Sequence, residues 1–289
     1  MRERIAECIE QFGWAPEHQV NCFFHSKDKD FESAFFITPD GRGLLVHVYD
    51  TEWVVFSEPL APLDERAQLI KALCHEAFTH AGIGKVVVEL VPQTRRALLE
   101  VLPPEFRSRA IAETMWWPVL DLATYDPSFV GPEYKSLRNA KNRFFREHSV
   151  GTKDAREVSK TDIHDIVARW QKGRKASHNV MPAEYHALID DDFQGTDGAR
   201  VVLVDGKPEA FYAGWRISHA RTYYLAISLH SYAYWGLGEV AMMDALDYLK
   251  IGGWEAVDLG GSDKKLFAFK EQFGKGSMYK THYFSIVKS

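Results

Sequence analysis

The chain has 289 residues, of which 46% are hydrophobic and 26% charged, as in ordinary globular proteins. This length suffices for two modest domains or for a single large one. A net charge of −5 excludes a general attraction to nucleic acid. We therefore expect no DNA partner, and any polyanion must bind at a local basic patch.

Membrane, disulfide and metal signals are weak. No run of 18 apolar residues exists, and the first 14 residues, MRERIAECIEQFGW, are charged and amphipathic, unlike a signal peptide. We therefore expect no membrane span and a cytoplasmic protein. Cys8, Cys22 and Cys74 are sparse and scattered, as reduced thiols usually are. Since neither CxxC nor HExxH occurs, we predict no metal and no resident cofactor.

Hydrophobic periodicity in the first half predicts alternating helices and strands. Helices are expected at 1–14, 63–81 and 94–102, and strands at 31–38, 44–49, 53–57, 85–91 and 106–122, the last with a bulge at 116–118.

The second half repeats this order. Helices are expected at 161–175, 182–191, 236–250 and 264–273, and strands at 200–205, 208–217, 221–229, 256–259 and 278–287. A hairpin, third strand, long helix, buried strand, short helix and last strand form the layout of the GNAT-type N-acyltransferase fold. We predict an α+β (α/β) protein of two tandem GNAT-like acyltransferase units with mixed central sheets, at residues 1–125 and 151–289.

Residues 126–150 join the predicted units and contain a helix expected at 133–148. One face of this helix is apolar, and the other carries cations and amides with no acidic partner before Glu147. Such a stripe favours phosphates, although a solvated surface face is the alternative. The candidate tRNA- or phosphate-binding residues here are Lys135, Arg138, Asn142, Arg143 and Arg146.

Glycines mark two turns near the C-terminus. Gly236 and Gly238 open a helix, whose N-terminus can hold a phosphate, although plain turn chemistry is the alternative. Gly260 and Gly261 follow a short strand and let a substrate approach the backbone closely. Ser262 completes this candidate substrate-binding turn, and we expect it to be a helix N-cap rather than a nucleophile.

Three segments together resemble a known family: FSEPLAPLDERAQLIKAL, SLRNAKNRFFREH and DLGGSDKKLFAFKEQFG. They are similar to the cytosolic C-terminal domain of lysyl- and alanyl-phosphatidylglycerol synthases. Its relatives include soluble aminoacyl-tRNA-dependent transferases and, more distantly, Fem-type peptidyltransferases. The resemblance spans residue 31 to the end. It implies transfer of an aminoacyl group from tRNA to an amine or hydroxyl, with the chemistry mainly in the second unit.

The resemblance also implies site residues. Lys270 matches the family's terminal lysine, and the tyrosine that follows is Tyr279 or Tyr283, of which we prefer Tyr283. The membrane-embedded half and the arginine-rich stretches of the lipid synthases are not evident. We therefore expect aminoacyl-tRNA as co-substrate and a small soluble molecule or peptide as acceptor.

Ester aminolysis requires positioning, proton transfer and oxyanion stabilisation. Lys270 is a candidate to contact a phosphate or ribose, with a solvated lysine on a short helix as the alternative. Tyr283 is a candidate to protonate the leaving oxygen, with a packing role as the alternative. Asp258 is a candidate to bind an α-ammonium group or to cap its turn, and His230 to act as a base or to serve a structural role. Residues between the first two helices of the second half are predicted to shape the acceptor pocket: Trp170, His178, Asn179 and Tyr185, with Arg174 and Lys175 adding positive charge.

Two other functions are compatible with these residues. Acyl-CoA-dependent N-acylation is the main alternative, because Gly236-Leu237-Gly238 resembles a shortened pyrophosphate loop. Tyr234 and Trp235 occupy the place of the basic residue expected before such a loop, which disfavours a CoA thioester. The third possibility is a degenerate transferase that binds RNA or a protein.

Overall fold

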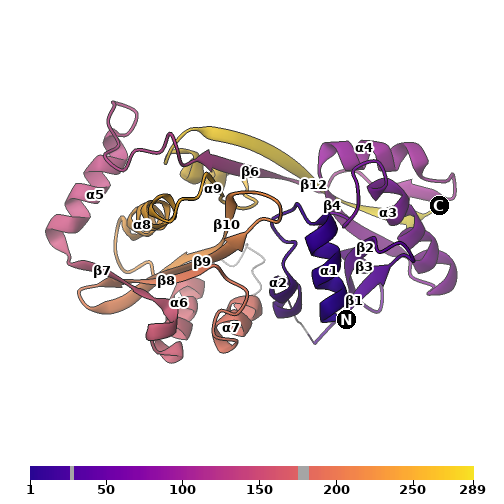
Figure 1. Ribbon diagram of the computed structural model, residues 1–289, viewed down its shortest axis with the longest axis horizontal. Helices are drawn as coiled ribbons and strands as arrows, with labels where there is room; N and C mark the ends of the chain where they lie inside the picture. Colours follow the sequence, from indigo (N-terminus) through magenta and orange to yellow (C-terminus); the bar gives the residue numbers. More distant parts are fainter. Residues whose placement is uncertain (27–28, 175–181) are drawn as a thin grey trace.

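The computed structural model describes residues 1–26, 29–174 and 182–289, whose strands form a single mixed sheet (Figure 1). The strand order is β1-β2-β3-β4-β12-β6-β11-β10-β9-β8-β7, with β5 beside β12. In chain order the strands are β1 (Glu32–Ile37), β2 (Gly43–Val48), β3 (Trp53–Val55), β4 (Lys85–Leu90), β5 (Phe106–Ser108), β6 (Glu113–Asp121), β7 (Val150–Asp154), β8 (Gly198–Val204), β9 (Lys207–Arg216), β10 (Thr222–His230), β11 (Ala256–Asp258) and β12 (Gly276–Lys288).

Helices cover the sheet of both halves. The first half carries α1 (Arg2–Phe12), α2 (Val20–His25), α3 (Arg66–His75), which continues into a π-helical turn (Glu76–His80), and α4 (Pro92–Val101). The second carries α5 (Lys135–Glu147), a 3₁₀ turn (Ala155–Glu157), α6 (Lys160–Gly173), α7 (Pro182–Asp190), α8 (Leu237–Ile251) and α9 (Lys264–Glu271).

Each half contains a parallel strand pair connected through a helix. Strand β3 pairs in parallel with β4 through α3, and β10 pairs in parallel with β11 through α8. A parallel pair requires such a crossover. The predicted order of hairpin, third strand, long helix and buried strand is therefore present twice.

The last strand of each half lies against the other half. Strand β6 pairs with β11, whereas β12 pairs with β4, and β6 and β12 pair with each other over Glu113–Leu120 and Gly276–Tyr283. The order β4-β12-β6-β11 joins the two halves into one continuous sheet. The boundaries at residues 125 and 151 remain a prediction, and each proposed unit contributes a strand to its neighbour.

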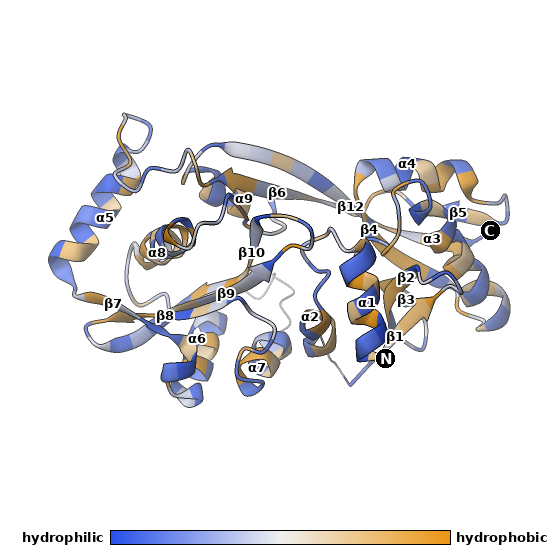
Figure 2. Ribbon diagram, viewed as in Figure 1, coloured by the Kyte–Doolittle hydropathy of each residue, from blue (hydrophilic) through white to orange (hydrophobic). Residues whose placement is uncertain are grey.

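The largest core lies around α8, which buries eight of its residues and lies between the sheet and α5 (Figure 2). Helix α5 contacts this core through Leu137 and Phe144 and also buries Ala140, the apolar face that the sequence predicts. A fully buried side chain such as Phe144 contributes about 1.5–3 kcal/mol. Helix α5 is therefore anchored on the second half.

Three local predictions were wrong or incomplete. The register between β6 and β12 runs without a shift through Trp116 and Pro118, so no bulge exists there, and the break in the predicted strand falls between β5 and β6. Helix α2 and strand β7 were not predicted. Both are short, and three of the five residues of β7 are Gly, Lys and Asp, which are depleted in strands.

Candidate active site

A cleft opens where β10 and β11 diverge. The two strands pair only over Thr222–Tyr224 and Ala256–Asp258, and side chains of α6, α7, α8 and α9 enclose the space beyond. This α8–α9 cleft has a volume of about 640 Å³, in the usual range for small-molecule sites. Predicted site residues that line it are Trp170, Tyr185, His230, Gly238, Gly260, Gly261 and Lys270.

Lys270 lies in the wall of this cleft, in the last turn of α9. The Asp263 carboxylate caps the start of α9 by accepting a hydrogen bond from the Leu266 N–H at 2.8 Å. Lys270 is 8% exposed, and its ammonium donates to the carbonyl oxygens of Leu259 and Gly260, the latter at 3.1 Å. An ammonium has three N–H donors, so one remains for a ligand in the cleft.

Asp258 ends β11 beside this lysine and is 1% exposed. Its carboxylate accepts from the Gly260 N–H at 2.8 Å and from the Tyr279 hydroxyl at 2.9 Å. The first bond caps the turn, which was one of the two roles predicted for Asp258. Gly260 permits the turn because its φ is +80°. Tyr279 also stacks on Trp117, with ring centroids 5.5 Å apart.

Burial shifts the pKa of both charged groups towards neutrality. It lowers the pKa of Lys270 to about 8, against the opposing effect of the Asp258 and Asp263 charges. Burial likewise raises the pKa of Asp258 to about 6, while the hydrogen bonds from Gly260 and Tyr279 and the Lys270 charge act in the other direction. Groups with such values can exchange protons near neutral pH, which is a property of many catalytic sites.

Strand β10 contributes an irregular backbone and a histidine to the cleft. Its register with β9 shifts between Tyr224 and Ile227, so that a bulge places backbone groups outside the regular ladder. At the end of β10, burial lowers the pKa of His230, which favours the neutral imidazole at pH 7. A Cβ atom on Gly238 would lie 2.9 Å from the His230 ring, so only glycine allows this approach of α8.

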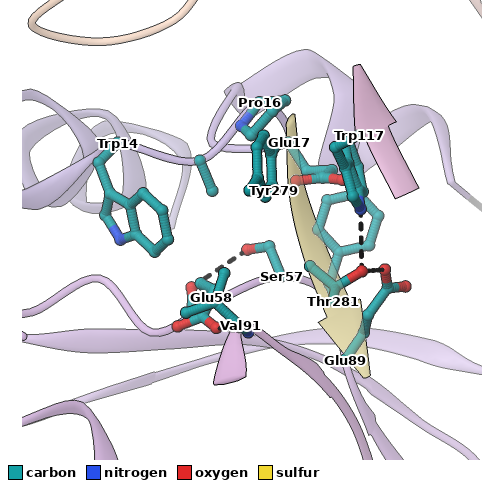
Figure 3. Close-up of a pocket in the computed structure, with 12 residues that line it drawn as sticks. Trp14, Pro16, Glu17, Ser57, Glu58, Glu89, Val91, Trp117, Tyr279 and Thr281 are labelled. Carbon is teal, nitrogen blue, oxygen red and sulfur yellow. Dashed lines mark hydrogen bonds between the residues drawn. The ribbon is translucent and has the colours of Figure 1, made fainter. Parts of the chain in front are cut away.

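A second, smaller space lies beside Tyr279. This central cavity of about 30 Å³ is lined by Glu17, Glu58, Glu89, Trp117 and Tyr279, among others (Figure 3). The volume suffices for one or two water molecules. Trp117 donates to the Thr281 hydroxyl at 2.9 Å, which in turn donates to Glu89.

The carboxylates of this cavity were not predicted. Burial raises the pKa of Glu17 to about 8, helped by the charges of Glu89, Asp258 and Glu58, and raises that of Glu58 to about 7. Glu58 accepts from the Val91 N–H at 2.6 Å and from Thr94 at 2.9 Å. The sequence did contain one signal for Glu89, because a glutamate within the apolar strand KVVVEL indicates a buried charged residue.

A wider cleft of about 870 Å³ borders the same cluster. This α4–β12 cleft is lined by Asp258 and Tyr279 together with Trp14, Met278 and the start of α4. Asp258 and Tyr279 therefore border the α4–β12 cleft, whereas the neighbouring Lys270 borders the α8–α9 cleft.

Several predicted residues lie elsewhere. The tyrosine beside Asp258 is Tyr279, whereas the preferred Tyr283 lies four residues further along β12, about 13 Å away, and is 38% exposed. Ser262 is fully buried and donates to the Gly260 carbonyl, and the N-cap of α9 is Asp263, so the N-cap prediction for Ser262 was wrong. His178, Asn179 and Lys175 lie outside the described residues.

The basic face of α5 borders the start of α8. Arg143 lies over the Trp235 ring at 5.0 Å, and Gly236, with φ +86°, packs near Phe144. Lys135, Asn142 and Arg146 are exposed. Arg138 instead donates to the carbonyl oxygens of Phe129 and Gly131, which fixes the chain before α5. Phosphate binding by these residues remains a prediction.

The described residues contain no cluster of three or more histidine, cysteine or acidic side chains arranged to hold a metal ion. Among the described helices, none is both long and apolar enough to span a membrane.

The sequence profile of a family described as "Phosphatidylglycerol lysyltransferase, C-terminal" matches residues 21–278. The chain belongs to this family. It is therefore an enzyme of the transferase class, and its family supports aminoacyl transfer in general. No curated protein matches the chain.

Solved structures agree with this fold. L-PGS from Bacillus licheniformis superposes with a TM-score of 0.70 at 17% identity, covering 99% of this chain and 91% of that one. FemX gives 0.63 at 10% identity, with 99% and 95% covered. A tandem GNAT protein from the clavulanic acid biosynthesis pathway gives 0.56 at 12% identity, with 99% and 93% covered. The predicted tandem GNAT-like fold is confirmed.

Proposed function

We propose that this family member transfers an aminoacyl group from aminoacyl-tRNA to an amine or hydroxyl of a small molecule or peptide, in the cytoplasm. The observation that supports this most is Lys270, a buried lysine that lines the α8–α9 cleft next to Asp258. A cation here can meet charge that develops on an ester oxygen during acyl transfer.

The reaction requires one bond to form, one to break and one proton to move. The acceptor nitrogen or oxygen bonds to the ester carbonyl carbon, and the bond from that carbon to the ribose oxygen breaks. In our proposal Lys270 donates a proton to the departing ribose oxygen and then takes the proton that the acceptor loses, while neutral His230 lines the donor side of the same cleft. Bulged backbone groups of β10 stabilise the oxyanion.

The two clefts support separate places for the substrates. The α8–α9 cleft borders the α8 N-terminus, which has no side-chain cap, and α5 with its cations lies beside that N-terminus. The uncapped helix N-terminus and the nearby cations favour a donor that carries phosphates. We place the acceptor in the α4–β12 cleft, which is large enough for a small molecule or short peptide and borders Asp258.

The test is incubation of the protein with a mixture of charged tRNAs and cell metabolites, followed by measurement of which aminoacyl ester is consumed. We expect loss of a particular aminoacyl-tRNA that depends on added acceptor. Calorimetry with CoA is the second arm, because tight CoA binding without ester consumption would favour acyl-CoA-dependent N-acylation instead.

A further inference from the structure

Two exposed aromatic side chains lie at the edge of the α8–α9 cleft. They belong to the turn between β10 and α8, where Tyr232 is 53% and Trp235 is 65% exposed. Tyr232 lines the cleft beside Gly173 of α6, and its ring lies 5.1 Å from that of His230. Trp235 follows three residues later, immediately before the α8 N-terminus. Large exposed aromatic groups at a cleft edge commonly mark a binding surface.

Cations lie over Trp235 and over a third ring, Trp170, inside the cleft. The Arg143 guanidinium lies 5.0 Å from the Trp235 ring centroid, and the Arg174 guanidinium lies 4.6 Å from that of Trp170 inside the cleft. Such contacts hold the guanidinium flat against an aromatic ring, and this pairing recurs in proteins that bind single-stranded nucleic acids.

The charge of this edge is weakly positive. Glu147 is shared between Arg143, at 3.0 Å, and the exposed Arg146, at 3.7 Å, which leaves one net positive charge at the end of α5. Arg174 adds a second, while Glu239 in the first turn of α8 subtracts one. Phosphate attraction alone is therefore modest, and the exposed rings must supply much of the affinity.

We propose that this edge binds the single-stranded 3′ end of a tRNA, with bases stacked on Trp235 and Tyr232. The inference rests on the proposed function and adds to it the residues that hold the donor. Tyr232 borders the cleft and so faces the terminal nucleotide, whose ester enters towards Lys270. Trp235 lies further out and receives a preceding base. Stacking of this kind does not read the base sequence, and no such reading is needed for an end that is common to all tRNAs.

Binding of a short single-stranded RNA that ends in CCA tests the surface directly. Trp235→Ala should weaken binding between about 5-fold and 150-fold, the loss that removal of one base–aromatic stack causes. Trp235→Phe keeps a ring and should stay within about threefold of the wild type. Ile251→Ala is the matched control, because Ile251 is 87% exposed and ends the same helix, α8, far from the cleft edge.

A kinetic comparison separates stacking from damage to the cleft. Trp235→Ala should lower kcat/KM for charged tRNA by a similar factor and leave that for 3′-O-aminoacyl adenosine unchanged, since this donor lacks the preceding nucleotides. Equal losses with both donors, or RNA binding unaltered by Trp235→Ala, would overturn the inference. RNA binding that depends on Trp235, in a wild type that consumes no aminoacyl ester, would uphold this surface and refute the proposed function.

Discussion

Replacement of Asp258 by asparagine should move the pH dependence of transfer, because it removes a negative charge from the surroundings of Lys270. The variant keeps the shape of the side chain and an oxygen that can accept from Gly260. At present the Asp258 charge raises the pKa of Lys270 and so offsets part of the desolvation that lowers it to about 8. Without that charge, the pKa of Lys270 falls further.

The size of the shift follows from the geometry. No ion pair within 4.0 Å joins the two side chains among the described contacts, so we expect a drop at the low end of charge–charge effects, about one pKa unit. With a change from about 8 to about 7, the protonated fraction of Lys270 is nearly equal in the two proteins at pH 6. It is about threefold lower in the variant at pH 7.5 and about ninefold lower at pH 9.

The assay is kcat/KM for the aminoacyl ester between pH 6 and 9, corrected for spontaneous ester hydrolysis. A role of Asp258 that does not depend on Lys270 lowers the whole profile equally, whereas the proposed role steepens the loss with rising pH. A ratio of wild type to Asp258→Asn that stays constant across this range would refute Lys270 as the proton donor.

Three further predictions use neighbouring groups. Tyr279→Phe should cost about 1–3 kcal/mol of unfolding free energy and lower kcat/KM, because it leaves the buried Asp258 oxygen without its donor, whereas Tyr283→Phe should change neither; equal effects would argue against the site. Gly238→Ala should lower kcat/KM by about 10- to 100-fold by displacing His230, with Gly84→Ala, in open space, as control; an active Gly238→Ala would exclude a need for this packing. Below pH 8 the buried charge of Lys270 lowers the free energy of unfolding. This loss disappears as pH rises from about 8 to 10.5, because the folded protein releases the lysine's proton before the unfolded chain does. The unfolding free energy of the wild type, minus that of Lys270→Met, should therefore rise by up to about 3 kcal/mol over that range. A difference that does not change with pH would contradict the buried ammonium.

Local patterns predicted most elements, because helix and strand periods are written in neighbouring residues. The apolar face of α5, the helix α8 between its glycines and the turn after β11 all follow from spacing of a few residues. Gly260 of this turn and Lys270 of the helix after it were predicted site residues, and the structure brings them to one cleft with Trp170 and His230.

Contacts between distant segments could not be predicted from local sequence patterns. The exchange of β6 and β12 is a choice of partner strand, which side-chain alternation does not encode. The sequence could not show which tyrosine adjoins Asp258, because Tyr279 and Tyr283 face the same side of β12 and only the position of β11 selects Tyr279. Glu17, Glu58 and Glu89 meet in the central cavity from three separate segments, so no local motif could join them.

The most direct measurement of the central claim is a structure of the protein with a stable amide analogue of 3′-aminoacyl adenosine. We expect the analogue to occupy the α8–α9 cleft, with its carbonyl or ribose oxygen within about 3 Å of the Lys270 ammonium. An analogue bound elsewhere, or bound in this cleft with Lys270 out of reach, would contradict the claim.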